Sequence, residues 1–181
     1  MAGGNAYRDI VVMLSAGDGA HARLEAAIAL AREHGARLTG LDVSARAAFE
    51  SARAERAAGI YDDFEERLRL AGVHGTFRTA DHPGRGGDKA LHIHYADLVI
   101  APTPAEAAQG LVLPEVPEEV LLGSGVPMLV IPELRPAGPL GRNIGVAWNA
   151  TREATRAVHA ALPPLTRAAA VTVFAFDRRA Q

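Results

Sequence analysis

The chain has 181 residues, of which 49% are hydrophobic and 22% are charged, a composition typical of a globular protein. Its formal net charge of −2 gives no reason to expect nucleic acid or an anionic membrane surface as a partner. The chain contains no cysteine, so disulfide bonds, thiol catalysis and cysteine-ligated metals are excluded. Residues 1–4 do not begin a signal peptide and no apolar run approaches the length of a membrane span, so we expect a cytoplasmic protein.

The stretch from Arg8 to Val43 predicts a strand, a helix and a second strand. Residues 10–14 form a continuous apolar run, which is typical of a strand buried on both faces. A helix follows, because four apolar residues recur with the spacing of one helical stripe: Leu24, Ala27, Ile28 and Ala31. Gly35 ends this helix, and residues 38–43 return as the second strand. Two strands joined by a helical crossover lie parallel, with the helix packed on the sheet.

The middle of the chain continues this alternation. Ser44 can cap a long helix over residues 45–71, in which Gly59 marks a break and Glu65 pairs with Arg69. The inner face of that helix consists of three apolar residues: Ile60, Phe64 and Leu68. The remaining elements are strands at 76–79, 98–101 and 128–131, with short helices at 88–95 and 116–122.

Alternating strands and helices predict an α/β fold with a doubly wound, mostly parallel, Rossmann-like sheet of five strands. Ligands of such sheets bind beyond the carboxyl ends of the strands, where the strand order reverses. The loops after Leu14 and after Ala101 are therefore the candidate ligand-binding loops.

The opening unit returns near the end of the chain. Residues 142–148 match residues 8–14 at an offset of 134, and residues 171–176 match the second strand after a slip of one residue. Val158, Ala161 and Leu162 repeat the helical stripe. We therefore expect one domain at residues 1–135, a linker rich in proline and glycine at 136–141, and an incomplete second domain at 142–181 that repeats only the opening βαβ unit.

Five stretches in this order resemble the universal stress protein family. They are residues 10–17, residues 96–100, residues 126–130, the set Ala29, Arg32, Gly35 and Leu38, and the second copy at 146–154. The order is similar to that of tandem bacterial members, which carry two such domains in one chain, with the second domain truncated here. The resemblance implies a stress-response protein with a Rossmann-like fold.

Nucleotide-binding members of that family carry an aspartate at the end of the first strand. After the fourth strand they carry a glycine, two residues, a glycine, nine residues, then glycine and serine or threonine. Ungapped counting back from Pro127 places other residues at these positions: Ser15 at the aspartate, Ala101, Pro104 and Pro114 at the glycines, and Glu115 at the hydroxyl residue. Proline has no N–H to offer a phosphate, and a carboxylate repels one. The resemblance therefore implies a degenerate phosphate loop, and we expect no cofactor.

A second motif offers a different interpretation. Gly17, Gly19 and Ala22 fit a G-x-G-x-x-A pattern between a strand and a helix, and Asp42 ends the next strand, where a dinucleotide fold places its ribose-binding acid. Against this, Gly17 follows the strand two residues late, and the repeat has no glycine there. His92 and His94 lie two apart, on nearly opposite sides of a helix, so they predict no metal site.

The sequence predicts a non-enzymatic binding or regulatory protein of the stress response, with no catalytic residues and no metal. One alternative is a small dinucleotide-binding Rossmann-type enzyme that uses Gly17, Gly19 and Asp42. The other is a structural dimerisation scaffold for a missing nucleotide-binding half.

The partners follow from the apolar strands of the tail, which is close to the size below which a lone core rarely suffices. We expect a homo-oligomer that buries the C-terminal unit and the edge strand running from Met128 to Ile131. Nucleic acid and membrane are not expected as partners, and the identity of a small-molecule ligand is left open.

Overall fold

The computed structural model describes residues 6–15, 18–44, 50–79, 93–103, 123–132 and 139–175. The chain divides into two compact units, Met1–Arg135 and Pro136–Gln181, which are described separately. We call them unit 1 and unit 2.

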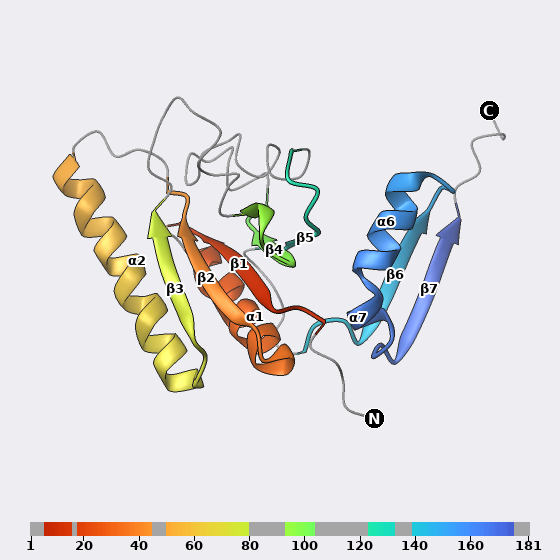
Figure 1. The fold of residues 1–181 in the computed structure, drawn as a ribbon, viewed down its shortest axis with the longest axis horizontal. Coiled ribbons are helices and arrows are strands. Elements are labelled where there is room, and N and C mark those ends of the chain that lie inside the picture. The colour runs from red at the N-terminus through yellow and green to blue at the C-terminus, as the bar shows by residue number, and fades with distance from the viewer. Residues whose placement is uncertain are drawn as a thin grey trace. The chain divides into compact units, whose positions relative to one another are not determined.

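Unit 1 is built on one parallel sheet of five strands. The strands are β1 (Asp9–Leu14), β2 (Arg37–Asp42), β3 (Gly75–Thr79), β4 (Leu98–Ala101) and β5 (Met128–Val130). They lie in the order β3-β2-β1-β4-β5, and every neighbouring pair is parallel (Figure 1). The predicted α/β fold with a five-stranded, Rossmann-like sheet is confirmed. The order reverses between β1 and β4, so these two strands flank the switch point.

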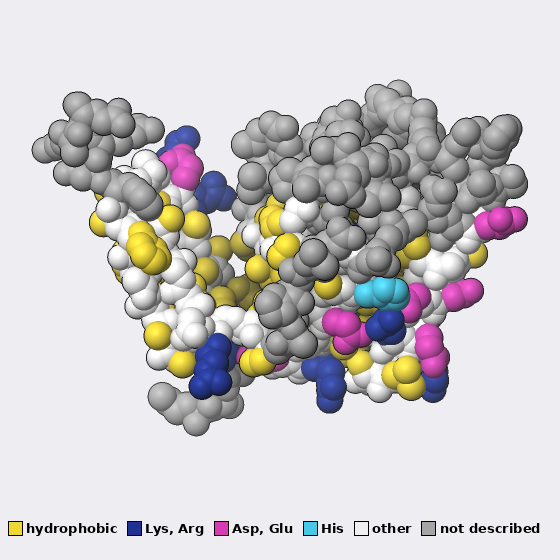
Figure 2. All heavy atoms as spheres, turned by 180° about the vertical axis from the view of Figure 1, so that it is seen from behind, with side chains coloured by type: hydrophobic (Ala, Val, Ile, Leu, Met, Phe, Trp, Pro, Cys, Tyr) yellow, Lys and Arg dark blue, Asp and Glu magenta, His cyan; other side chains and the backbone are white. Residues whose placement is uncertain are grey.

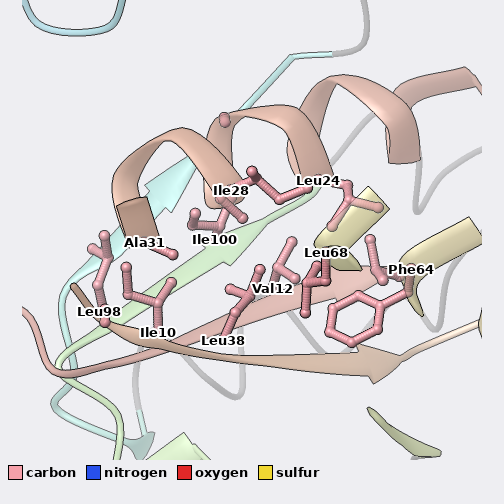
Figure 3. Close-up of a cluster of buried hydrophobic side chains, with 14 of the residues drawn as sticks. Ile10, Val12, Leu24, Ile28, Ala31, Leu38, Phe64, Leu68, Leu98 and Ile100 are labelled. Atoms are coloured by element: carbon pink, nitrogen blue, oxygen red, sulfur yellow. The ribbon is translucent and has the colours of Figure 1, made fainter. Parts of the chain in front are cut away.

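One face of the sheet is covered by α1 (Asp18–His34) and α2 (Glu50–Ala71). Apolar side chains of both helices meet those of β1, β2 and β4 in a continuous buried cluster, as Figure 3 shows for Leu24, Ile28, Phe64 and Leu68 above the strands. Gly35, at φ 61°, follows α1 as predicted, because glycine accepts this left-handed conformation without a steric penalty.

The opposite face has a second cluster, which alternation along the strands requires. Val11 and Met13 of β1 point away from the α1 face and pack with residues of the neighbouring strands and with Ile93. Since β1 is buried on both faces, its continuous apolar run is explained.

Two expectations for α2 are wrong. The helix runs unbroken through Gly59, and Arg69 forms its ion pair with Glu66, three residues before it, and not with Glu65. The predicted capping of this helix by Ser44 depends on residues 45–49, which lie outside the described residues, as do 88–92 and 116–122 of the two short helices.

Unit 2 contains the predicted βαβ unit. Its elements are β6 (Asn143–Trp148), α6 (Arg152–Ala160), α7 (Leu162–Leu165) and β7 (Ala170–Ala175). The two strands are parallel, in register from Asn143 beside Ala170 to Trp148 beside Ala175. Thr151 starts α6, because its hydroxyl oxygen accepts a hydrogen bond from the backbone N–H of Ala154.

The crossover helix of unit 2 is shorter than its counterpart in unit 1. The stripe of Val158, Ala161 and Leu162 was expected to lie on one helix, but the helix breaks at Ala161 and resumes as the single turn α7. Pro163 and Pro164 explain the break, because neither has the backbone N–H that would continue the hydrogen bonds of α6. None of the described residues of unit 2, 139–175, is buried.

Candidate functional site

The carboxyl edge of the unit 1 sheet, at the switch point between β1 and β4, is the candidate site. Ser15 follows β1 directly, and Pro102 and Thr103 follow β4. The pairing of Ile10 with Leu98 sets the two strands side by side, so both loops leave the sheet at the same edge. This is the location that the alternation of strands and helices predicted.

A buried arginine lies at the end of β1. The guanidinium of Arg23, in the second turn of α1, donates from Nε to the carbonyl oxygen of Met13 at 3.1 Å and from an Nη to the hydroxyl oxygen of Ser15 at 2.9 Å. Arg23 is fully buried and Ser15 is 3% exposed. Burying a cation is costly unless hydrogen bonds compensate for the lost water. These two bonds therefore stabilise the buried guanidinium and hold the carboxyl end of β1 in place.

The sequence analysis identified the Ser15 position and missed Arg23. The sequence did offer one signal, which is an arginine directly before Leu24, the first residue of the apolar stripe of the helix. An arginine placed there has the reach to return to the strand end from which the helix departs. The position that the family resemblance assigns to a carboxylate is thus a neutral hydroxyl bonded to a cation.

The carboxyl end of β2 contributes a second polar group. Asp42 lies beside Leu14 in the strand register, and its carboxylate accepts a hydrogen bond from the backbone N–H of Ser44 at 2.9 Å. The Ser44 hydroxyl oxygen is buried and, within the described part of the chain, has no hydrogen-bond partner. Asp42 therefore stabilises its own turn, and Ser44 leaves one unused polar atom near the site.

The other residues of the predicted sites are only partly described. Ala101 is buried and pairs with Val130 of β5, while Pro104, Pro114 and Glu115 lie outside the described residues. Gly17, which belongs to the alternative dinucleotide motif, also lies outside the described residues. Gly19 lies in the first turn of α1, and Asp42 is held as described above.

A network of charged side chains joins α1 to α2 away from this edge. Arg67 of α2 bonds to Asp63 one turn before it and reaches across to Glu25 and His21 of α1. The hydrogen bond to Asp63 is the main reason why the pKa of Arg67 is raised, and the bond to Glu25 acts in the same direction. These groups are partly exposed, so the network positions the two helices and forms no enclosed site.

The described residues show no other chemical centre. They contain no group of three or more histidine, aspartate or glutamate side chains that could hold a metal ion. No helix among them is long and apolar enough to cross a membrane. On the face that Figure 2 draws, acidic and basic side chains lie next to one another and do not gather into a patch of one sign.

Solved structures with this fold come from several organisms. A protein of the universal stress protein family from Burkholderia pseudomallei is 24% identical, with a TM-score of 0.54, and the match covers 72% of this chain and 99% of that one. A universal stress protein from Archaeoglobus fulgidus is 14% identical, with a TM-score of 0.72, and the match covers 97% of this chain and 68% of that one. At these identities the likeness shows the fold.

A third structure is a universal stress protein from Archaeoglobus fulgidus in complex with dAMP. It is 15% identical, with a TM-score of 0.51, over 69% of this chain and 98% of that one. No curated protein matches this chain significantly. The model of the Universal stress protein family matches residues 6–132, which is well over half of the sequence and includes all five strands of unit 1. The chain belongs to the universal stress protein family.

Proposed function

We propose that this protein is a non-enzymatic binding module of the stress response whose first unit does not bind magnesium ATP. The observation that carries the proposal is the Arg23 guanidinium bonded to Ser15 at the end of β1. Magnesium requires oxygen ligands, preferably carboxylates and waters, and a fixed cation at this strand end repels it. A triphosphate that brings its metal into the site therefore meets unfavourable electrostatics.

The sequence after β4 supports the same conclusion. If the ungapped register holds, Pro104 and Pro114 replace glycines whose neighbouring N–H groups would cradle phosphates, and Glu115 adds a negative charge. A nucleoside monophosphate has one phosphate group and less negative charge than a triphosphate, so its binding depends less on the cradle and on the metal. The dAMP bound by the Archaeoglobus fulgidus relative makes this class the natural probe for the carboxyl edge.

Titration of the full chain with magnesium ATP and with dAMP, followed by calorimetry and by thermal unfolding, tests this proposal. A ligand with micromolar affinity at a thousandfold excess over its Kd stabilises a protein by about 4 kcal/mol, which is readily detected. We expect no such stabilisation by magnesium ATP, no release of phosphate on incubation, and a larger response to dAMP than to magnesium ATP. Micromolar binding or hydrolysis of magnesium ATP would contradict the proposal.

A parallel titration with NADH addresses the dinucleotide alternative. Because Asp42 already accepts a hydrogen bond within its own turn, Asp42→Asn should leave the affinity for any ligand within a factor of a few. If NADH binds and Asp42→Asn abolishes the binding, the chain is a dinucleotide-binding domain instead.

A further inference from the structure

The backbone carbonyl of Met13, near the end of β1, points toward β4. Successive carbonyls of a strand face its two neighbours in turn. The carbonyl of Leu14 accepts a hydrogen bond from the backbone N–H of Val43, just after β2, and the carbonyl of Asp9 accepts one from Asp97, just before β4. Met13 is one residue before Leu14 and four residues after Asp9, so both bonds place its carbonyl on the β4 side.

The register of the sheet identifies the group that should donate to such a carbonyl. Ala101 lies beside Val130, and its carbonyl accepts a hydrogen bond from the backbone N–H of Ile131, one residue past its partner. The same offset is found at the end of β1, where Leu14 lies beside the residue that precedes its donor. The donor is therefore the residue that follows the register partner.

Applied to Met13, this rule points to a proline. The strands β1 and β4 are in register up to Val12 beside Ile100, which sets Met13 beside Ala101. The donor should then be residue 102, but Pro102 has no backbone N–H. The hydrogen bonds between β1 and β4 must end at this point, which is the switch point of the sheet.

Arg23 supplies the hydrogen bond that Pro102 cannot. Its Nε donates to the Met13 carbonyl oxygen at 3.1 Å, and an Nη donates to the Ser15 hydroxyl oxygen at 2.9 Å. Arg23 is fully buried, and Pro102 is buried as well. The guanidinium therefore takes a position where β1 and β4 part, which is where an open α/β sheet binds its ligand.

The βαβ unit itself does not need an arginine at this position. By the internal repeat, at an offset of 134, Arg23 corresponds to Ala157 of α6. Unit 2 forms the same strand, helix and strand with this alanine. At the end of its first strand, the side-chain oxygen of Asn149 accepts hydrogen bonds from the backbone N–H and the hydroxyl of Thr151. The contribution of Arg23 is therefore separate from the formation of a βαβ unit.

We propose that Arg23 determines which ligands unit 1 admits, because its side chain occupies the switch point and keeps phosphate groups out of it. This inference rests on the proposed function, in which the carboxyl edge is the ligand-binding site. Before a phosphate can reach the end of β1, Arg23 must leave and give up its bonds to Met13 and Ser15. The apparent affinity is then reduced by the fraction of molecules in which the side chain has left.

Titration of the full chain with dAMP in the presence of EDTA tests this role by calorimetry. Arg23→Ala removes the occupying side chain, so it should bind dAMP at least about tenfold more tightly than the wild-type protein. Arg23→Met fills much of the same space without a charge, so its affinity should stay within about threefold of wild type. Arg32→Ala, which removes an exposed arginine from the last turn of α1, is the matched control and should bind like wild type.

A double-mutant cycle with Pro102→Ala tests the replaced hydrogen bond without any ligand. Alanine at this position restores a backbone N–H that can reach the Met13 carbonyl. Arg23→Ala should therefore raise the equilibrium constant of unfolding by about tenfold in the otherwise wild-type chain, and by less than about threefold in the Pro102→Ala background. Urea unfolding of the four proteins, followed by circular dichroism, measures both ratios.

The proposal is overturned if Arg23→Ala binds dAMP no more tightly than wild type, or if Arg23→Met gains as much affinity as Arg23→Ala. It is also overturned if the effects of Arg23→Ala and Pro102→Ala on unfolding are additive. Micromolar binding of magnesium ATP by the wild-type protein would contradict the proposed function, and that result is distinct from each of these comparisons.

Discussion

At the scale of single residues, the end of β1 is defined by a side chain that sequence patterns do not reveal. The sequence analysis assigned Ser15 to the position of the family's aspartate, and that assignment depends only on the resemblance and on counting residues. The arrival of Arg23 at the same point depends on where a helix packs and on how far a long side chain reaches. Periodicity finds apolar stripes, so a buried arginine beside Leu24 escapes it.

The hydrogen bond to the Ser15 hydroxyl should contribute more to the free energy of unfolding than an ordinary buried hydrogen bond, since its donor carries a charge. Ser15→Ala should lower the free energy of unfolding by about 1.5–3 kcal/mol, because a guanidinium donor loses its acceptor in a buried position. Ser124→Ala is a suitable comparison, since the Ser124 hydroxyl accepts a hydrogen bond from the neutral backbone N–H of Val126. That variant should lose only about 0.5–1.5 kcal/mol. Urea unfolding of both variants measures the difference, and equal losses would argue against a charged donor.

At the scale of elements, the sequence predicted those strands and helices whose periodicity is strong. The apolar runs of β1 and β4 and the stripes of α1 and α2 are confirmed, because burial on one or both faces dictates their patterns. The errors arise where the helix propensity of single residues competes with the packing of an apolar face. Gly59 was read as a helix break, yet the apolar face that includes Phe64 and Leu68 keeps α2 continuous. In α6 the reverse happens, and Pro163 and Pro164 interrupt a stripe that periodicity alone would extend.

Two glycines of unit 1 allow a direct comparison of packing with propensity. A Cβ atom on Gly75 of β3 would lie 2.5 Å from the carbonyl oxygen of Leu38 and would also collide with Leu68, so neither strand nor helix has room for it. Gly75→Ala should therefore destabilise the protein by about 1–3 kcal/mol. Gly59 of α2 has open space around it, so Gly59→Ala should stabilise the helix by about 0.5–1 kcal/mol. The midpoint temperature of unfolding should fall for Gly75→Ala and rise for Gly59→Ala. Shifts of the same sign would contradict the packing described for one of the two glycines.

At the scale of the whole molecule, the sequence repeat predicted that residues after 141 form the same βαβ unit as residues 8–43, and the elements of unit 2 agree with this. Their burial could not be predicted, because it depends on what covers the strands. In unit 1 the sheet has a cluster on each face, whereas the described residues of unit 2 include none that is buried.

Hydrogen exchange should separate the two units. At low protein concentration the amides of β1, β2 and β4 should exchange only through global unfolding, because these strands lie inside a buried sheet. The amides of β6 and β7 should exchange several orders of magnitude faster, since few apolar contacts oppose their opening. If exchange of the two units is equally slow in the monomer, unit 2 has a stability that its exposed surface does not explain.

The position of β1 in the middle of the sheet also sets the order in which unit 1 assembles. Pairing of β1 with β2 closes a short segment, since Asp9 and Arg37 are 28 residues apart. The contact beside β4 closes a longer one, because the carboxylate of Asp97 accepts a hydrogen bond from the backbone N–H of Asp9, 88 residues earlier in the chain. By the logarithmic dependence of loop closure on length, the second step costs about 1 kcal/mol more entropy. A nascent chain can therefore fold the first βαβ unit on the ribosome long before β4 emerges, and during that interval β1 is itself an open edge. Unit 2 has the same order of elements as that early intermediate, with β6 and β7 joined by a helical crossover.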